Sequence, residues 1–276
     1  MKKIIMNTNE ELNFLLEYLI EEHKDTIEIP ENLEDKKRLF RSLCNIRPPK
    51  PITEEFLKIQ DSYLTKENNT IINSENIPPI NPKSKIALWR GDITQLKVDT
   101  IVNACNNQLL GCFIPLHNCI DNKIHSAAGI QLRLDCNEIM IKQGHLEKNG
   151  DAKITPAYNL PSKYVIHTVG PQITSKVHEQ DKIDLENCYI SSLEKCEEYN
   201  IKSIAFPCIS TGVFSFPEVE AAKIATNTVK KYLNENQNTK IEKVIFNVFT
   251  ENSNQIYRKI LLWKNKKSFR TTRKCR

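Results

Sequence analysis

Apolar residues in the first 84 positions recur at spacings of three and four, the period of an amphipathic helix. Three helices are predicted there, with apolar residues Leu12, Leu15, Leu16, Leu19 and Ile20 in the first, Leu33, Leu39, Phe40 and Leu43 in the second, and Phe56, Leu57, Ile59, Tyr63 and Leu64 in the third. Thr8 stands three residues before Glu11, a capping-box spacing that marks the start of the first helix. Pro48, Pro49 and Pro51 end the second.

From Lys85 onward the pattern changes to short apolar runs that alternate with helical segments. Strands are predicted over 86–89, 100–104, 153–158, 163–169, 203–209 and 243–249, and helices over 122–142, 184–199, 218–233 and 253–263. Strands that alternate with helices indicate an α/β layer sandwich with a largely parallel or mixed sheet. Ligands of such sheets bind at the carboxyl ends of the strands, so the loops after Trp89, Ala104 and Ile209 become the informative ones.

Glycine and proline divide the chain into segments. All seven glycines lie between Gly91 and Gly212, whereas six of the thirteen prolines lie between Pro48 and Pro82, and residues 73–83 read as a linker. We therefore expect a helical N-terminal extension and linker over 1–84, one α/β domain over 85–263 and a tail over 264–276. The extension holds no catalytic pattern and is interpreted as a packing cap on the domain that follows.

The composition is that of a soluble globular protein. The 276 residues are 39% hydrophobic, 26% charged and 7% aromatic, which excludes collagen-like and disordered chains. No apolar run approaches the roughly 18 residues of a membrane span, and the N-terminus lacks the apolar core of a signal peptide. We expect a cytoplasmic protein without membrane contact, in which the nine cysteines stay reduced.

The formal net charge of +5 is concentrated in the tail. Residues 86–263 hold nineteen basic and nineteen acidic side chains, while residues 264–276 hold seven basic and no acidic ones. A basic face of the kind that grips nucleic acid is therefore not expected on the domain. Nucleic acid is an improbable partner, and a role in binding it would rest on the tail alone.

A cluster of potential metal ligands follows the strand over 100–104. Cys112, His117 and Cys119 stand at C-x4-H-x-C spacing in a short loop, and thiolate and imidazole groups are the ligands that zinc prefers. Three ligands without a second Cys pair favour an open site with one position for water or substrate. The alternative is two buried cysteines and a surface histidine. Nearby candidates for a fourth ligand are Cys105, His125 and Cys136, of which the last two are better interpreted as core or capping residues.

Two further loops have the composition of a binding site. Ser210 to Pro217 leads from a predicted strand into a helix, where backbone N–H groups can cradle a phosphate without a lysine, although a plain turn explains the segment equally well. Gly91 to Thr94 reads as a turn. Small polar residues adjoin the cysteine cluster and can bind sugar hydroxyls, orient a water or cap a helix, namely Asn103, Asn106, Asp121 and Asn122.

Five ordered blocks resemble the macrodomain family: residues 91–94, 98–106, 124–129, 163–171 and 209–214. The loop with Cys112, His117 and Cys119, together with the helical extension, is similar to zinc-containing macrodomains that hydrolyse protein ADP-ribosylation. The resemblance implies a three-layer α/β/α macrodomain with a central mixed sheet, preceded by the N-terminal helical extension.

The resemblance also implies roles for individual residues. Asp92 would accept a hydrogen bond from the adenine amino group, and Ile93 would contact adenine through its backbone. Asn106 would touch the distal ribose, and Asp121 falls where related hydrolases have an acidic residue before the helix. The remaining ligand contacts would come from Cys119, Ile120 and Asn122 beside the metal and from Ser210, Thr211, Gly212, Val213 and Phe214 around the pyrophosphate and ribose.

These roles define a predicted function. We expect a Zn2+-dependent hydrolase that removes mono-ADP-ribose from modified protein side chains and releases ADP-ribose, acting as a monomer. Zinc would sit on Cys112, His117 and Cys119 with a water or a ribose oxygen as its fourth ligand, and Asn106 and Asp121 would be the catalytic residues. The alternative is a non-catalytic reader of ADP-ribose with a structural zinc. Ser215 departs from the family, which often has glycine there.

Overall fold

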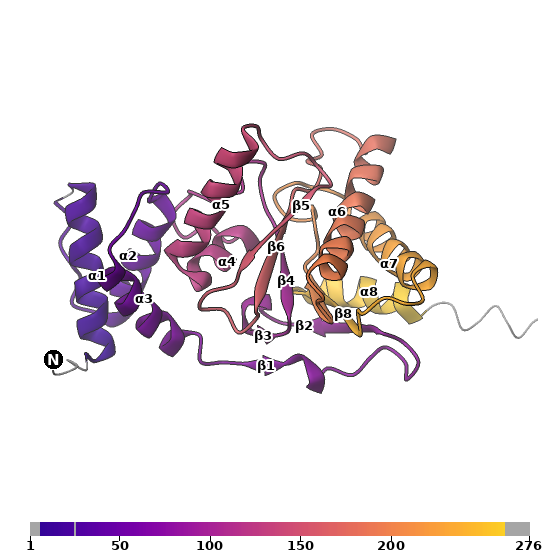
Figure 1. The fold of residues 1–276 in the computed structure, drawn as a ribbon, viewed down its shortest axis with the longest axis horizontal. Coiled ribbons are helices and arrows are strands. Elements are labelled where there is room, and N and C mark those ends of the chain that lie inside the picture. Colours follow the sequence, from indigo (N-terminus) through magenta and orange to yellow (C-terminus); the bar gives the residue numbers. More distant parts are fainter. Residues whose placement is uncertain (1–5, 25, 263–276) are drawn as a thin grey trace, which may run out of the picture.

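The computed structural model describes residues 6–24 and 26–262, so the predicted basic tail over 264–276 lies outside the described residues. The three predicted N-terminal helices are confirmed as α1 (Thr8–His23), α2 (Leu33–Ile46) and α3 (Glu54–Glu67). They form a separate group at the left of Figure 1, beside α4 and α5 of the α/β body. Their shared core consists of Leu12, Leu15, Leu16, Leu19, Phe40, Leu43, Phe56, Tyr63, Leu64 and, from the body, Ile130.

The cap of α1 differs from the predicted one by one residue. Asn7, rather than Thr8, is the N-cap, and it exchanges hydrogen bonds with Glu10 at 2.8 and 3.0 Å. Glu11, which the capping-box spacing had assigned to the cap, is buried and accepts a hydrogen bond from Lys66 Nζ on α3 at 2.6 Å. A shift of one residue thus turns the expected capping residue into a link between α1 and α3.

The central sheet has six strands: β2 (Ile86–Arg90), β4 (Thr100–Ala104), β5 (Ala152–Pro156), β6 (Tyr164–Thr168), β7 (Ser203–Phe206) and β8 (Lys243–Val248). Their spatial order is β2-β8-β7-β4-β6-β5, and every neighbouring pair is parallel except β5 with β6. The sheet is therefore mixed, as predicted.

Five helices cover the sheet: α4 (Ile120–Ala128), α5 (Ile130–Gln143), α6 (Glu179–Glu198), α7 (Glu218–Glu235) and α8 (Glu251–Leu262). Figure 1 shows α4 and α5 on one side of the sheet and α6 and α7 on the other. The strands alternate between these layers, because successive side chains point to opposite faces. On β4, Ile101 packs with α4 residues such as Ile124, whereas Val102 packs with α6 residues such as Leu185. This confirms the three-layer α/β/α architecture.

The predicted long helix over 122–142 is two helices in the structure. Gly129, with φ 101° and ψ 175°, separates α4 from α5, a conformation that glycine adopts without steric cost. Gln60 of α3 fills the gap, since its Oε1 accepts a hydrogen bond from Ile130 N–H at 3.0 Å. The apolar period continues across the break, which is why the pattern alone predicted a single helix.

Two other boundaries differ from the predicted ones by three residues or more. Helix α6 begins at Glu179, five residues earlier than predicted. Its first turn is polar, so the apolar pattern did not include it, and Asp181 caps the turn by accepting the His178 N–H at 2.7 Å. Strand β7 ends at Phe206 rather than at 209, because the next residue, Pro207, lacks the N–H that a parallel ladder needs.

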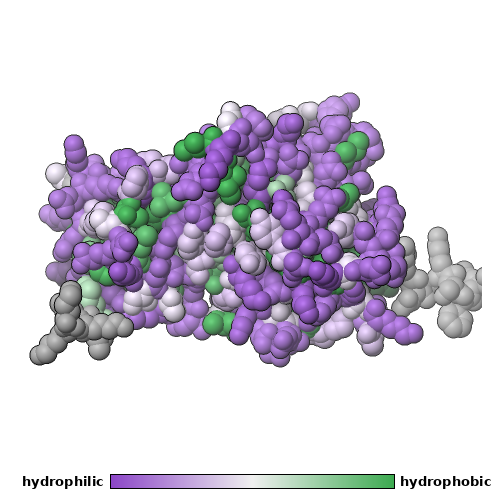
Figure 2. Space-filling model, in the orientation of Figure 1, coloured by the Kyte–Doolittle hydropathy of each residue, from purple (hydrophilic) through white to green (hydrophobic). Residues whose placement is uncertain are grey.

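The predicted linker over 73–83 contains short elements of its own. Strand β1 (Ile72–Asn73) pairs in parallel with β3 (Leu96–Lys97), and the 3₁₀ helix η1 (Ser74–Asn76) follows it. The linker therefore runs along the α/β body rather than away from it. Figure 2 shows one face of the molecule, which is predominantly hydrophilic with scattered hydrophobic residues. Within residues 6–24 and 26–262, no helix is both long and apolar enough to cross a membrane.

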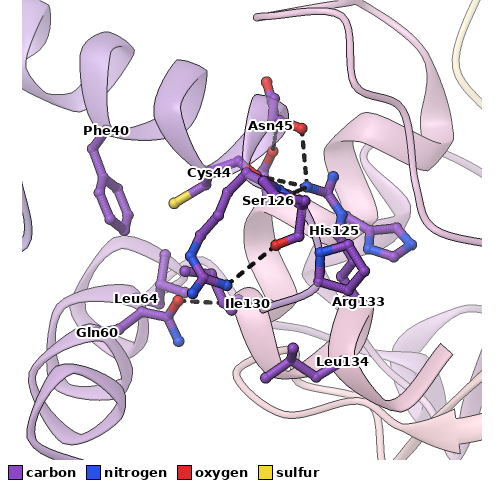
Figure 3. Close-up of a pocket in the computed structure, with 14 residues that line it drawn as sticks. Phe40, Cys44, Asn45, Gln60, Leu64, His125, Ser126, Ile130, Arg133 and Leu134 are labelled. Carbon is purple, nitrogen blue, oxygen red and sulfur yellow. Dashed lines mark hydrogen bonds between the residues drawn. The ribbon is translucent and has the colours of Figure 1, made fainter. Parts of the chain in front are cut away.

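The helical extension joins the α/β body through Arg133 of α5. The Arg133 guanidinium is buried and its Nη1 donates to the carbonyls of Cys44, Asn45 and Arg47 at 2.9, 2.9 and 2.5 Å. These carbonyls belong to the C-terminal end of α2, whose last turn leaves them without helical partners and with a partial negative charge. A cavity of about 30 Å³ lies beside this junction (Figure 3), with room for one or two waters but not for a nucleotide.

Candidate functional site

The predicted site residues lie on loops at one edge of the sheet. Strands β2, β4, β7 and β8 are mutually parallel, so their carboxyl ends meet there. Residues 91–94 follow β2, the loop with the three metal-ligand candidates follows β4, and residues 207–217 follow β7. The structure therefore brings together segments that are more than a hundred residues apart in the chain.

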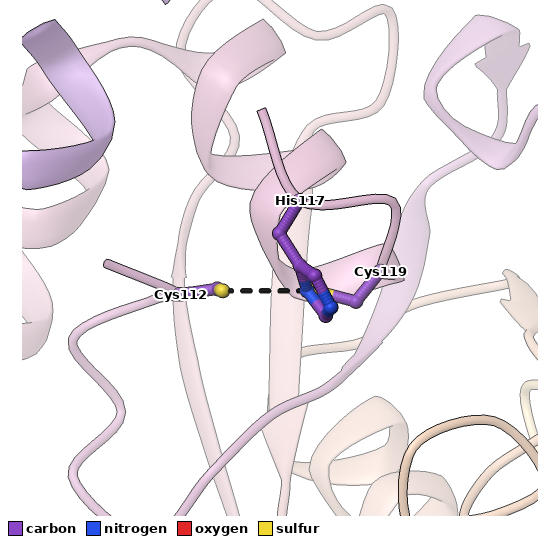
Figure 4. A group of neighbouring side chains, drawn as sticks. All are labelled: Cys112, His117 and Cys119. Atoms are coloured by element: carbon purple, nitrogen blue, oxygen red, sulfur yellow. Dashed lines mark hydrogen bonds between the residues drawn. The ribbon is translucent and has the colours of Figure 1, made fainter. Parts of the chain in front are cut away.

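Cys112, His117 and Cys119 form one cluster, as the spacing predicted (Figure 4). Their ligand atoms all lie within 4.8 Å of one another, and Cys112 Sγ is 3.5 Å from His117 Nδ1. The loop that presents them folds sharply at Gly111, where φ is 79°, and at Leu116, where φ is 57°. A leucine in the left-handed region costs about 1–3 kcal/mol, so surrounding bonds must hold it there.

The residue types of this cluster, and the 3.5 Å between Cys112 Sγ and His117 Nδ1, are compatible with a zinc site. Tetrahedral zinc has bonds of about 2.0 Å to nitrogen and 2.3 Å to sulfur, which place neighbouring ligand atoms about 3.5 Å apart. Cys119 is the N-cap of α4, and its Sγ accepts the N–H of Asn122 at 3.4 Å. Burial raises the pKa of Cys119 to about 11, so a metal ion must displace its proton, assisted by the positive end of the α4 dipole.

Asp121 lies immediately behind this cluster and is almost fully buried, with 5% of its surface exposed. Its Oδ1 accepts a hydrogen bond from Asn103 Nδ2 at 2.8 Å, and Asn106 Nδ2 lies 3.4 Å from its Oδ2. Burial raises the pKa of Asp121 to about 6, against the opposing effects of the Asn103 hydrogen bond and of the Arg133 charge. Asp121 therefore loses its proton closer to neutral pH than an exposed aspartate does.

A buried histidine continues this network into the core. Asn103 Nδ2, which donates to Asp121, also faces His167 Nδ1 at 3.2 Å, so that ring nitrogen is the acceptor. His167 Nε2 then carries the proton and lies 2.9 Å from Thr155 Oγ1. Burial lowers the pKa of His167 to about 3, so the ring is neutral. The chain from Thr155 to Asp121 fixes the direction of the carboxylate.

His125, Cys136 and His167 form a second group of potential ligand atoms within 4.8 Å. Both ring nitrogens of His167 are already hydrogen-bonded, and all three side chains are buried in the interior. Burial lowers the pKa of His125 and raises that of Cys136. This group therefore behaves as a neutral core cluster, in agreement with the interpretation of His125 and Cys136 as core residues.

The loop after β2 places Asp92 at the start of the 3₁₀ helix η2 (Ile93–Gln95). Asp92 Oδ1 accepts from the N–H and the hydroxyl of Thr94 at 3.0 and 2.7 Å, while Oδ2 has no partner among the described residues. The Ile93 side chain is buried, so only its backbone is available to a ligand. Asp92 thus has a free oxygen at the sheet edge, where the adenine contact was predicted.

The loop after β7 presents unpaired backbone donors. Thr211 N–H bonds back to Cys208 O at 3.4 Å and Phe216 N–H to Ser210 O at 2.9 Å, whereas none of the N–H groups of residues 212–214 has a partner within the described chain. A Cβ on Gly212 would meet no atom within 4 Å, so open space lies beside it. Three free donors around an open space have the form of an anion-binding cradle.

Ser215 adopts φ 58°, the left-handed conformation for which the family often uses glycine. The departure noted in the sequence therefore leaves the local backbone in the conformation that glycine would favour. The bond from Ser215 N–H to Gly212 O at 3.0 Å closes this turn.

Sequence reasoning missed three residues at this edge. Phe249 follows β8 beside Gly91 and is 72% exposed, so its ring is free to stack on a planar group. An aromatic residue at the end of the predicted strand over 243–249 was the available signal. Arg41 and Asn45 of α2 contact the loop with the cysteines, and no local pattern could have identified them because their partners lie 76 and 71 positions away in the chain.

Comparisons with known proteins agree with this geometry. The family model described as Macro domain matches residues 102–225. A protein from Treponema medium named protein-ADP-ribose hydrolase is 46% identical over 262 residues, which are 93% of this chain and 100% of that protein. A protein of the same name from Staphylococcus aureus strain MSSA476 is 47% identical over 251 residues, covering 88% of this chain and 93% of that protein.

Solved structures show the same fold. A macrodomain variant from Oceanobacillus iheyensis with ADPR is 36% identical, covers 64% of this chain and 92% of its own, and has a TM-score of 0.59. The Trypanosoma brucei macrodomain in complex with ADP-ribose is 27% identical over 80% of this chain and 94% of its own, with a TM-score of 0.63. The chain therefore belongs to the macrodomain family. Three relatives that are 46–47% identical to this chain over 88–93% of its length are named protein-ADP-ribose hydrolase.

Proposed function

We propose that this protein is a zinc-dependent hydrolase that removes mono-ADP-ribose from modified protein side chains. The observation that carries the proposal is the contact between Asn106 and the buried Asp121 carboxylate, in the first turn of the helix that Cys119 of the cluster caps. A reader of ADP-ribose needs no buried carboxylate with a pKa near 6 at this place. The proteins named protein-ADP-ribose hydrolase, 46–47% identical to this chain, support the same activity.

ADP-ribose would lie along the sheet edge. The free Oδ2 of Asp92 accepts a hydrogen bond from the adenine amino group, and the exposed ring of Phe249 stacks on the base. The unpaired N–H groups of residues 212–214 bind the pyrophosphate without a basic side chain. The distal ribose then reaches Asn106 and Asp121, where the bond to the modified protein is broken.

Hydrolysis breaks the bond between the anomeric carbon of the distal ribose and the side-chain atom that carries it. A water oxygen bonds to that carbon, and the leaving side-chain atom takes a proton. Asp121 accepts the proton of the water, because a carboxylate with a pKa of about 6 is ionised at neutral pH yet basic enough to take part. Asn106 is held by its contacts with Asp121 and with Gly111 O at 3.1 Å, and it positions the sugar.

Cys112, His117 and Cys119 would hold the zinc ion. When bound, zinc supplies a Lewis acid that can lower the pKa of a water to about 7 or orient a ribose oxygen. The described cysteines are all free thiols, which supports a reducing compartment such as the cytoplasm. We propose that the protein acts as a monomer.

The test compares wild type with Cys119→Ala and Asp121→Asn. Zinc content is measured on each purified protein, and ADP-ribose release is measured from a mono-ADP-ribosylated protein substrate. We expect wild type to hold one zinc and to release ADP-ribose, and both variants to lose at least 100-fold in rate, the order of magnitude of a general-base contribution. Binding of ADP-ribose by wild type without release would identify a reader. Full turnover by folded, zinc-free Cys119→Ala would exclude a catalytic zinc.

A further inference from the structure

Helix α2 of the N-terminal extension contacts the loop that carries the three cluster residues. Arg41 Nη2 donates to the carbonyl of His117 at 3.1 Å and to Asn122 Oδ1 at 2.6 Å, and its Nε lies 3.2 Å from the same oxygen. The guanidinium therefore bonds the backbone of His117, a cluster residue, and makes two hydrogen bonds to the side chain of Asn122 in the first turn of α4. Two N–H groups on one acceptor fix its direction better than a lysine could.

Asn122 in turn contacts the other two cluster residues, Cys112 and Cys119. Its side chain is fully buried, and Nδ2 donates to Ile114 O at 3.0 Å and lies 3.5 Å from Cys112 O. Its backbone N–H points at Cys119 Sγ at 3.4 Å. Both ends of the Asn122 amide are bonded within the protein. It connects Arg41 to the backbone of Cys112 and to the sulfur of Cys119, while Arg41 itself bonds the backbone of His117.

Asn45, one turn after Arg41 on α2, holds the tip of the same loop. Its Oδ1 accepts the N–H of Leu116 at 3.0 Å, and its Nδ2 donates to Ser126 Oγ on α4 at 3.1 Å. Leu116 is the residue with φ 57° directly before His117. Asn45 thus anchors the strained position of the loop, and both of its amide groups are used in doing so.

We propose that α2 is part of the active site and that Arg41 and Asn45 are positioning residues for the loop from Cys112 to Cys119. The inference rests on the proposed function, since it assigns these residues to a zinc-binding loop. It replaces the interpretation of the extension as a packing cap alone. Residues that orient metal ligands from outside commonly change metal affinity by about 10- to 100-fold.

The experiment uses the full chain with Arg41→Gln and Asn45→Ala. Arg38→Gln is the matched control, because Arg38 is an exposed arginine on the same helix with no hydrogen bond in the described structure. Zinc loss is followed with the chelating dye 4-(2-pyridylazo)resorcinol, and loop order by amide hydrogen exchange of residues 112–119. We expect each variant to lose zinc about 10-fold or more faster and to exchange faster in this loop, with Arg38→Gln unchanged.

Turnover gives a further readout that a merely structural role would not produce. We expect kcat for ADP-ribose release to fall about 10-fold or more in Arg41→Gln while KM changes less, because the pyrophosphate cradle after β7 is untouched. Exchange in β4 and β7 must stay at the wild-type level, which separates a loosened loop from a destabilised fold.

The failures are distinguishable. Wild type that binds no zinc or releases no ADP-ribose contradicts the proposed function, and loop exchange alone then decides whether α2 orders the loop. The other outcome is an active wild type together with variants whose zinc loss, loop exchange and kcat equal those of wild type. That result would overturn the inference about Arg41 and Asn45 but would not contradict the proposed function.

Discussion

The Asn103 amide nitrogen lies 2.8 Å from Asp121 Oδ1, and the same nitrogen faces His167 Nδ1 at 3.2 Å. One amide therefore ties the carboxylate at the sheet edge to a neutral histidine in the core. Because Asn103 itself is fully buried, solvent cannot replace either contact. The orientation of Asp121 is consequently a property of the sheet and not of the exposed loop in front of it.

The activity of the wild type should depend on the ionisation of Asp121. With its pKa raised to about 6 by burial, the carboxylate becomes a base as the pH rises through that value. We expect kcat for ADP-ribose release to rise with a midpoint near pH 6 in wild type, and Asp121→Asn to show only a small residual rate without that midpoint. A wild-type profile that is flat from pH 5 to 8 would contradict this role.

The same carboxyl group should affect stability in the opposite direction. Its folded pKa lies above the unfolded value of about 3.9, so the stability it contributes is present at low pH and is lost as the pH rises from about 4 through 6. The shift of about two units corresponds to about 3 kcal/mol. We therefore expect Asp121→Asn to be more stable relative to wild type at pH 8 than at pH 4. The measurement is the free energy of unfolding of both proteins by urea denaturation at each pH.

His167 should contribute to acid sensitivity. Burial lowers its pKa to about 3, below the unfolded value of about 6.5, so its contribution to stability is complete above pH 6.5 and is lost as the pH falls toward 3. The free energy of unfolding should fall with decreasing pH less steeply in His167→Gln than in wild type. The difference in slope should be up to about 1.4 kcal/mol per pH unit. His145→Gln, at an exposed histidine, should leave the slope unchanged.

Arg133→Met should weaken the attachment of the helical extension. The buried guanidinium bonds the carbonyls of Cys44, Asn45 and Arg47, and its Nε donates to Leu110 O at 2.6 Å. Leaving these acceptors buried and unpaired should reduce the free energy of unfolding by about 3 kcal/mol or more.

The matched control is Arg90→Met, since Arg90 forms an exposed ion pair with Glu251. Such pairs contribute less than about 1 kcal/mol, so this change should be nearly neutral in the same urea experiment. Equal effects of the two substitutions would show that the Arg133 contacts do not stabilise the junction.

Gly111→Ala tests whether a side chain at this position disturbs the loop from Cys112 to Cys119. Gly144→Ala is the matched control. The two glycines have similar φ values, 79° and 75°, but a Cβ on Gly111 would lie 2.8 Å from the His125 ring, whereas one on Gly144 would meet nothing within 4 Å. Both substitutions incur the cost of about 1 kcal/mol for a left-handed alanine. We expect only Gly111→Ala to lose zinc and ADP-ribose release, and similar losses in both would exclude the steric explanation.

Local patterns in the sequence were sufficient for the parts of this protein that depend on neighbouring residues. The period of Leu12 to Leu19 predicted α1, alternating runs predicted the strands, and the close spacing of Cys112, His117 and Cys119 predicted a cluster that the fold assembles. Such features follow from backbone periodicity and short loops, which leave few alternatives. The break at Gly129 escaped the pattern, because the apolar period runs across it.

Only the tertiary structure decided which distant residues complete the site. Arg41 reaches His117 across 76 positions, and Asn103 reaches His167 across 64, distances over which a single sequence contains no pairing signal. Burial, too, is a property of the whole fold, and it is burial that turns Asp121 from a possible helix cap into a carboxyl group with a pKa near 6. The sequence alone therefore determined the cluster of Cys112, His117 and Cys119 and the layers of the fold, whereas packing between the extension and the α/β body determined how the cluster is held.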